Sequence, residues 1–293
     1  MELKVWRAVG FAGVAVGLLH ASAVAAESPK LLWEATGFAT PESVLPDTGA
    51  GVLYVSNVNG AADGKDGNGF ISKVSLDGKT VDLKWSTGFN APKGLALTGG
   101  KLYTSDIDEV IEIDAKDGKV FNRYAAKDAK FLNDVAADAA GNVYISDMAT
   151  NTIWRLAAGK LEVWLQDAGL EHPNGLLVEG GALRVAAWGS MTDNSPGRPK
   201  GHLLSVSLAD KSITPLGKSD LAGHLDGIEP LAGGGYIVSD WMAGGVWRVS
   251  ADGAAQKLLD LGQGAADLGY DPASKTLFMP QMMKGVLQAY RIE

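Results

Sequence analysis

Short apolar runs separated by polar turns repeat along the whole chain. The run that starts at Leu53 reads LYVSN, and it mixes apolar residues with small polar ones in the manner of a β-strand. Runs of the same character start at Leu102, Val143, Leu183, Tyr236 and Leu277. The pattern therefore predicts six copies of one strand-rich unit.

A second short motif precedes each of these runs and fixes the period. Its six copies are Pro41-Glu42-Ser43, Pro92-Lys93-Gly94, Leu132-Asn133-Asp134, Pro173-Asn174-Gly175, Leu225-Asp226-Gly227 and Ala266-Asp267-Leu268. Their central residues lie 40 to 52 positions apart. A period of about 40–45 residues with four strands per unit is typical of propeller blades. We therefore expect an all-β fold, a six-bladed β-propeller with four antiparallel strands in each blade.

The fourth unit shows the strands of one blade. Apolar stretches at 176–178, 183–187, 203–208 and 213–216 are separated by turn residues. Other units carry Asp-Gly at the last of these turns, as at Asp77-Gly78 and Asp117-Gly118. Asp-Gly between alternating runs is a strong hairpin signal, so antiparallel hairpins are expected within each blade.

The two ends of the repeat region predict how the ring closes. The sixth unit stops after its third strand, at 286–292, whereas an unassigned strand-like run occupies 31–35. That N-terminal run can supply the missing fourth strand and remove an exposed sheet edge. Residues 30–293 are therefore expected to form a single propeller domain whose last blade is completed by the N-terminal strand.

The first 25 residues have the order of parts of a secretory signal peptide. Lys4 and Arg7 precede an apolar stretch at 9–19. Ala23-Val24-Ala25 follows as a small-x-small cleavage site, with Ala21-Ser22-Ala23 as a second option. The stretch is shorter than the roughly 20 residues that a membrane span needs, although an uncleaved anchor is the alternative. We expect an exported protein of the bacterial periplasm, without membrane attachment after cleavage.

Composition and charge narrow the classes of partner. The formal net charge is −8, and the chain contains no Cys. An acidic balance disfavours a nucleic-acid partner, which requires clustered Lys and Arg. The lack of Cys excludes disulfides, thiolate metal sites and Cys nucleophiles. A small-molecule substrate is the expected partner, and the oligomeric state is left open.

The repeat places six polar residues in one ring. The central residues of the six motifs are expected to point at the channel mouth on one face of the propeller. Glu42, Asn133, Asn174 and Asp226 offer four side-chain oxygens, a set suited to Ca²⁺, although other divalent ions are possible. The alternative is that these residues cap turns, as Asn and Asp often do.

These motifs resemble those of the senescence marker protein/gluconolactonase family, also called regucalcin-like, across about residues 30–293. The resemblance rests on Pro41-Glu42, Asn133-Asp134-Val135, Pro173-Asn174-Gly175 and Asp226-Gly227. It implies a catalytic calcium held by Glu42, Asn133, Asn174 and Asp226. Its superfamily also includes diisopropyl fluorophosphatase and the paraoxonases. Sugar-lactonase members usually carry an Arg just before the Asn-Asp pair, where this chain has Phe131-Leu132.

The resemblance implies hydrolysis of a lactone, ester or organophosphate, with Asp226 as the catalytic base or nucleophile. A non-catalytic periplasmic binding or scaffold propeller with a structural metal is the alternative, because propellers host many functions.

Six further residues are candidates for the substrate pocket. Trp188 and Trp241 follow equivalent strands and could wall it, or could pack between blades. His172 and His224 each precede a predicted ligand by two positions, which along an extended chain returns a side chain to the same side. They could shuttle protons, or they could be hydrogen-bonded structural histidines. The last two, Lys93 and Asp267, complete the ring. We expect Lys93 to extend into solvent, as Lys usually does, rather than to bind a substrate carboxylate. Two long loops, at 58–69 and 189–201, are expected to flank the pocket.

Overall fold

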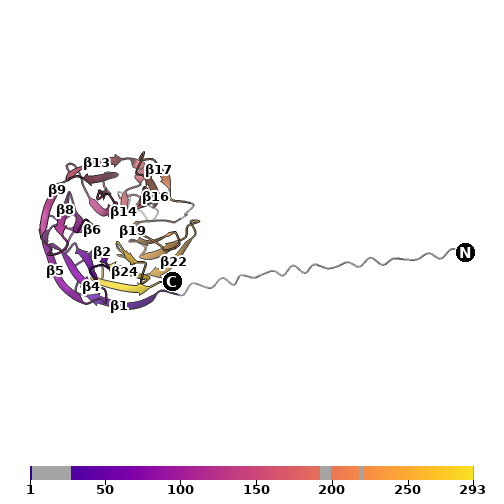
Figure 1. Ribbon diagram of the computed structural model, residues 1–293, viewed down its shortest axis with the longest axis horizontal. Coiled ribbons are helices and arrows are strands. Elements are labelled where there is room, and N and C mark those ends of the chain that lie inside the picture. The colour runs from indigo at the N-terminus through magenta and orange to yellow at the C-terminus, as the bar shows by residue number, and fades with distance from the viewer. Residues whose placement is uncertain (2–27, 192–198, 218–220, 293) are drawn as a thin grey trace.

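The computed structural model of the chain describes residue 1 and residues 28–191, 199–217 and 221–292. Six antiparallel sheets are arranged as a ring (Figure 1). The predicted signal peptide and part of the second long loop lie outside the described residues. Among the described residues, no helix is both long and apolar enough to cross a membrane.

Each blade contains four consecutive strands, except that the sixth borrows one. Blade 1 contains β2 (Pro41–Asp47), β3 (Val52–Asn57), β4 (Gly69–Ser75) and β5 (Thr80–Phe89). Blade 2 contains β6 (Pro92–Thr98), β7 (Lys101–Asp106), β8 (Glu109–Asp114) and β9 (Val120–Ala125). Blade 3 contains β10 (Leu132–Ala137), β11 (Val143–Asp147), β12 (Thr152–Ala157) and β13 (Lys160–Gln166), followed by the 3₁₀ turn η1 (Ala168–Leu170).

The second half of the ring follows the same order. Blade 4 contains β14 (Pro173–Glu179), β15 (Ala182–Ala187), β16 (Gly201–Ser207) and β17 (Ile213–Pro215), with the short β18 (Ala222–Gly223) also paired to β16. Blade 5 contains β19 (Leu225–Pro230), β20 (Tyr236–Asp240), β21 (Gly245–Val249) and β22 (Ala255–Asp260). Blade 6 contains β23 (Gly269–Asp271), β24 (Thr276–Gln281), β25 (Val286–Arg291) and β1 (Lys30–Thr36). The predicted six-bladed fold with four strands per blade is confirmed.

The N-terminal strand closes the last blade, as predicted. β1 pairs antiparallel with β25, from Lys30 opposite Arg291 to Thr36 opposite Val286, and both strands run along the same side of the ring in Figure 1. Trp33 anchors the closure: its ring centroid lies 6.0 Å from that of Phe278, and its indole N–H donates to the carbonyl of Leu76 at 3.1 Å. Sheet pairing thereby joins the two ends of the chain within blade 6, and the hydrogen bond of Trp33 to Leu76 connects that blade to blade 1.

The apolar core lies between neighbouring blades. One cluster joins Tyr144 and Ile153 of blade 3 to Leu183 and Val206 of blade 4, and all four are buried. Contacts between the first strands run around the ring, from β2 through β6, β10, β14, β19 and β23 back to β2. These six strands therefore surround the central channel, and residues at their beginnings are brought together although they are far apart in sequence.

Candidate functional site at one mouth of the channel

The first strand of five blades carries a β-bulge at the motif found in the sequence. The register shifts lie between Pro41 and Val44, Pro92 and Leu95, Leu132 and Val135, Pro173 and Gly175, and Leu225 and Ile228. Each shift contains the central residue of its motif: Glu42, Lys93, Asn133, Asn174 or Asp226. Bulges re-aim side chains near functional sites, and here they turn five polar side chains towards one cavity.

Side chains at the end of the second strand hold these bulges. The hydroxyl of Ser56 accepts a hydrogen bond from the Ser43 backbone N–H at 2.9 Å, and that of Ser146 accepts one from Asp134 N–H at 2.8 Å. Ser239 does the same for Gly227 at 2.8 Å. Because a bulge leaves backbone groups without ladder partners, these serines satisfy donors that would otherwise be buried unpaired.

The bulges open onto a cavity of about 260 Å³. All five bulge residues contribute to its floor. The rest of the lining that the structure describes is apolar: Ala62, Phe131, Met148, Trp188, Met191, Trp241 and Met282. Ala62 and Met191 come from the two long loops, so both loops contribute to the wall, as expected. The four oxygen-bearing residues predicted from sequence thus line one cavity together with Lys93.

Two of the predicted ligands have a buried oxygen without a hydrogen-bond partner: Oε2 of Glu42 and Oδ1 of Asn174. The Asn174 amide nitrogen donates to Asp226 Oδ1 at 2.9 Å and to the Leu225 carbonyl at 3.0 Å. The Asn133 amide nitrogen donates to Met148 Sδ at 2.7 Å. Both amides therefore use their N–H groups on protein partners and leave Oδ1 for another ligand.

The negative charge at this floor is compensated only in part, by the ammonium group of Lys93, which lowers the pKa of Glu42. Burial, reinforced by the charges of Asp226 and Asp267, holds the pKa of Glu42 well above its usual range. Burial and the charge of Asp267 likewise raise the pKa of Asp226, against the opposing effect of its hydrogen bond from Asn174. Buried charges are costly unless they are paired or coordinate a metal, so the floor would be stabilised by a cation.

The donor chemistry fits a hard divalent cation. Two carboxylates and two amides provide only oxygen ligands, which Ca²⁺ prefers. Among the described residues, no group of three or more His, Cys, Asp or Glu side chains could hold a metal ion, so a site here depends on the amide oxygens. The two orphaned oxygens are the structural observation that favours such a site over simple turn caps.

Lys93 is buried, and the expectation that it extends into solvent is wrong. The residue is 2% exposed, and its Nζ donates to the Ala91 carbonyl at 3.0 Å and lies 4.7 Å from the Phe131 ring centroid. Burial lowers the pKa of Lys93, whereas the charge of Glu42 opposes this effect. The bulge explains the position, because it turns the side chain inward over the floor.

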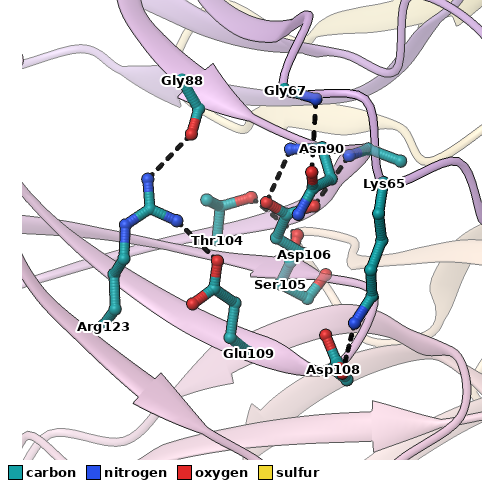
Figure 2. Close-up of polar contacts among 11 residues, drawn as sticks. Lys65, Gly67, Gly88, Asn90, Thr104, Ser105, Asp106, Asp108, Glu109 and Arg123 are labelled. Carbon is teal, nitrogen blue, oxygen red and sulfur yellow. Dashed lines mark hydrogen bonds and ion pairs between the residues drawn. The ribbon is translucent and has the colours of Figure 1, made fainter.

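The turn that supports Lys93 is fixed by Asp106, at the end of β7. Its carboxylate accepts hydrogen bonds from the backbone N–H groups of Asn90 at 2.8 Å and Ala91 at 2.7 Å (Figure 2). Figure 2 also shows how the first long loop is attached to blade 2: Lys65 pairs with Asp108 at 2.6 Å, and Gly67 N–H donates to the Asn90 side chain at 3.3 Å. The loop that carries Ala62 is thus tied to the turn that carries Ala91.

Trp188 and Trp241 line the cavity side by side, as predicted for a pocket wall. Their ring centroids are 6.0 Å apart, at an interplanar angle of 51°. The indole N–H of Trp241 is directed to Met282 Sδ at 3.3 Å. The two alternatives from sequence, pocket wall and packing between blades, are therefore both realised, because the rings belong to adjacent blades.

His172 and His224 lie outside this cavity lining, which agrees with the alternative of hydrogen-bonded structural histidines and not with a place in the pocket. Nδ1 of His172 lies 2.7 Å from the Met148 carbonyl, and Nδ1 of His224 lies 2.7 Å from the Trp188 carbonyl. His172 has a φ of 60°, so the side-to-side alternation of an extended chain fails there. Each imidazole thus contacts the backbone carbonyl of a residue that lines the cavity.

Asp267 also lies outside this cavity, and its assignment to the same mouth is wrong. Ala265 pairs with Gln281 at the end of the second strand of blade 6, as Pro41 pairs with Asn57 in blade 1. Ala266 is therefore the equivalent of Glu42, and Asp267 is the equivalent of Ser43. Asp267 lines a second cavity of about 200 Å³, together with Asp134 and Glu229. Its Oδ2 accepts a hydrogen bond from Ser43 at 2.5 Å, and burial raises its pKa to about 7.

Five lining residues were not identified from sequence: Ala62, Phe131, Met148, Met191 and Met282. All are apolar residues in loops or turns, and loop position carries no periodic pattern. The sequence offered one signal for them: Met148 directly follows the second strand of its blade, as the predicted pocket residue Trp188 does in the next blade.

Together, the fold and this mouth define a six-bladed propeller with an oxygen-lined pocket on its axis. No family model and no curated protein matches the chain. Among solved structures, a gluconolactonase from Xanthomonas campestris matches at 19% identity and a TM-score of 0.68, over 91% of this chain and 95% of that one. A putative gluconolactonase matches at 19% identity and 0.66, over 92% and 93%.

A virginiamycin B lyase from Staphylococcus aureus, solved with quinupristin, matches at 14% identity and a TM-score of 0.60, over 92% of this chain and 99% of that one. At such identities these likenesses show a shared fold, and fold alone does not determine function. The fold expected from the family resemblance is therefore confirmed, and the activity depends on the site.

Proposed function

We propose that this protein is a divalent-metal-dependent hydrolase, with Ca²⁺ as the working ion and a lactone, ester or organophosphate as the substrate. The observation that carries the proposal is the pair of buried, unpartnered oxygens of Glu42 and Asn174 on a floor that also holds Asp226. The fold shared with gluconolactonases supports the same reaction class.

Glu42, Asn133, Asn174 and Asp226 would hold the ion. When bound, Ca²⁺ supplies Lewis-acid polarisation of a carbonyl or phosphoryl oxygen. The chain's own residues position the reactants. Asn174 fixes one oxygen of Asp226 through its amide N–H, which leaves the other carboxylate oxygen to act.

Asp226 has two possible roles, as general base or as nucleophile. As a base, its free oxygen accepts a proton from the attacking water, which then adds to the substrate carbonyl or phosphorus. As a nucleophile, that oxygen attacks the carbonyl carbon or phosphorus, and the bond to the alcohol or other leaving group breaks. The resulting acyl- or phosphoryl-enzyme is then hydrolysed by water. Turnover in H₂¹⁸O tests the nucleophile role: water that attacks the Asp226 carboxyl carbon of the intermediate leaves ¹⁸O in Asp226, whereas general-base catalysis leaves Asp226 unlabelled.

The test uses mature protein stripped with chelator and assayed on lactones, aryl esters and organophosphates with and without Ca²⁺. We expect calcium-restored turnover that falls by about 10²–10⁴-fold in Asp226→Asn. Asp252→Asn is the matched control, because Asp252 lies in an exposed turn of the same blade. Calcium binding without turnover of any class would instead favour the binding or scaffold propeller.

We also propose that the protein is exported to the periplasm. The support is the signal-peptide pattern of residues 1–25. Expression of the full chain in a Gram-negative host, followed by fractionation and N-terminal sequencing, should give a periplasmic protein that begins at Ala26. A full-length N-terminus in the membrane fraction would identify an uncleaved anchor.

A further inference from the structure

Polar and apolar residues of the cavity are segregated by their structural origin. Among the described residues of the lining, every charged or amide side chain comes from a bulge at the start of a first strand: Glu42, Lys93, Asn133, Asn174 and Asp226. The other side chains that the structure describes in the lining are apolar or aromatic, and they lie above that floor, in the turns and loops of the mouth. A substrate would therefore meet polar chemistry at one end and an apolar wall along its sides.

The wall offers few hydrogen-bonding groups. Apart from the two indole N–H groups and the thioether sulfurs, the described wall side chains carry no polar atoms. The Trp241 N–H is already directed to Met282, and the sulfur of Met148 already accepts from Asn133. Phe131 is occupied on one face by the ammonium group of Lys93, 4.7 Å from its centroid. The Trp188 indole N–H is left as the side-chain donor of the described wall, so most hydroxyl groups of a ligand placed against this wall would lose their water without gaining a partner.

We propose that the substrate has an apolar group, an alkyl chain or an aromatic ring, beside its reactive carbonyl or phosphoryl centre. This inference rests on the hydrolase function proposed above and names its substrate class. The reactive centre lies over the polar floor, and the apolar group packs against Trp188, Trp241 and the methionines. A polyhydroxylated sugar lactone is rejected, because unpaired burial of hydroxyl groups is costly.

The size of the cavity limits the apolar group. At about 260 Å³, the volume lies below the roughly 300–1,000 Å³ that is usual for ligand pockets. Methionine adapts its shape to irregular ligands, so the wall can accept both chains and rings. The preferred substrate is thus a small, monosubstituted lactone or ester.

The first experiment measures kcat/KM of the calcium-loaded protein on δ-valerolactone, δ-octalactone, δ-decalactone and D-glucono-δ-lactone. We expect an increase of about fourfold for each added CH₂ until the cavity is full. D-glucono-δ-lactone is expected to be the poorest substrate. Equal or better turnover of the sugar lactone would overturn the proposal while leaving the hydrolase function intact.

A variant pair links this preference to the wall. Trp241→Leu should lower the ratio of δ-decalactone to δ-valerolactone turnover by about tenfold, because it removes apolar contact area. Trp247→Leu is the matched control, since Trp247 lies on β21 of the same blade and outside the cavity lining. An unchanged ratio in Trp241→Leu, with both variants folded by circular dichroism, would overturn the role of the wall.

A binding measurement keeps the inference testable if no lactone is hydrolysed. δ-Valerolactam and its pentyl-substituted derivative are titrated calorimetrically into the calcium-loaded protein. The pentyl compound should bind at least tenfold more tightly, and Trp241→Leu should remove most of this gain. Equal affinities, or no binding of either compound, would overturn the apolar pocket, whereas failure of turnover alone would overturn only the hydrolase function.

Discussion

Replacement of Asp106 by Ala tests whether the turn beneath Lys93 depends on one buried carboxylate. Asp106 is fully buried and accepts backbone hydrogen bonds from Asn90 and Ala91 at 2.8 and 2.7 Å (Figure 2). Hydrogen bonds to charged groups contribute about 1.5–3 kcal/mol each, so the loss of both should cost about 3–6 kcal/mol. Because burial raises the pKa of Asp106, desolvation already offsets part of this gain, and the lower end is expected.

A loss of this size is large beside the roughly 5–15 kcal/mol by which domains are stable. Equilibrium unfolding in urea, followed by circular dichroism, measures it. Asp106→Asn, which retains an acceptor without the charge, should lose about half as much. Asp108→Ala is the control from the same network: its pair with Lys65 is exposed, and such pairs contribute about 0–1 kcal/mol. A cost below about 1 kcal/mol for Asp106→Ala would refute the reasoning.

Two other predictions concern the channel. Burial, reinforced by the charge of Asp267, raises the pKa of Glu229 in the folded state from the ordinary value of 4.5 to about 8. Between these two pH values, the folded state keeps a proton on Glu229 that the unfolded state has released. The free energy of unfolding should therefore fall as pH rises through this window, by at most about 1.4 kcal/mol per pH unit from this group. Glu229→Gln should flatten this pH dependence, measured by urea unfolding. The same slope in the variant and the parent would disprove the prediction. At Gly175, an added Cβ would lie 1.8 Å from the Asp226 carbonyl oxygen, so Gly175→Ala should lower the free energy of unfolding by at least about 2 kcal/mol. Gly49→Ala is the control, because its Cβ would meet only Asp47 Oδ1 at 3.5 Å. That variant should have the melting temperature of the parent.

The candidate site could be predicted from sequence as far as the repeat was regular. Glu42, Asn133, Asn174 and Asp226 occupy equivalent places in four units, and equivalent places in a propeller converge on the axis. The repeat failed at the sixth unit, where the structure shifts Asp267 by one position relative to Glu42. In a strand such a shift moves a side chain to the other face, which is why Asp267 lies in the second cavity.

The sequence by itself determined the number of blades, their strand order and the closure by β1, because turn chemistry and strand patterning are local properties that repeat. It also determined which residues carry oxygen at the mouth. Tertiary structure alone decided which way these residues point, since the bulges depend on hydrogen bonds between strands, such as Ser56 to Ser43. It also buried Lys93 and assembled the apolar wall from loops of different blades, because packing between distant segments leaves no periodic trace in the chain.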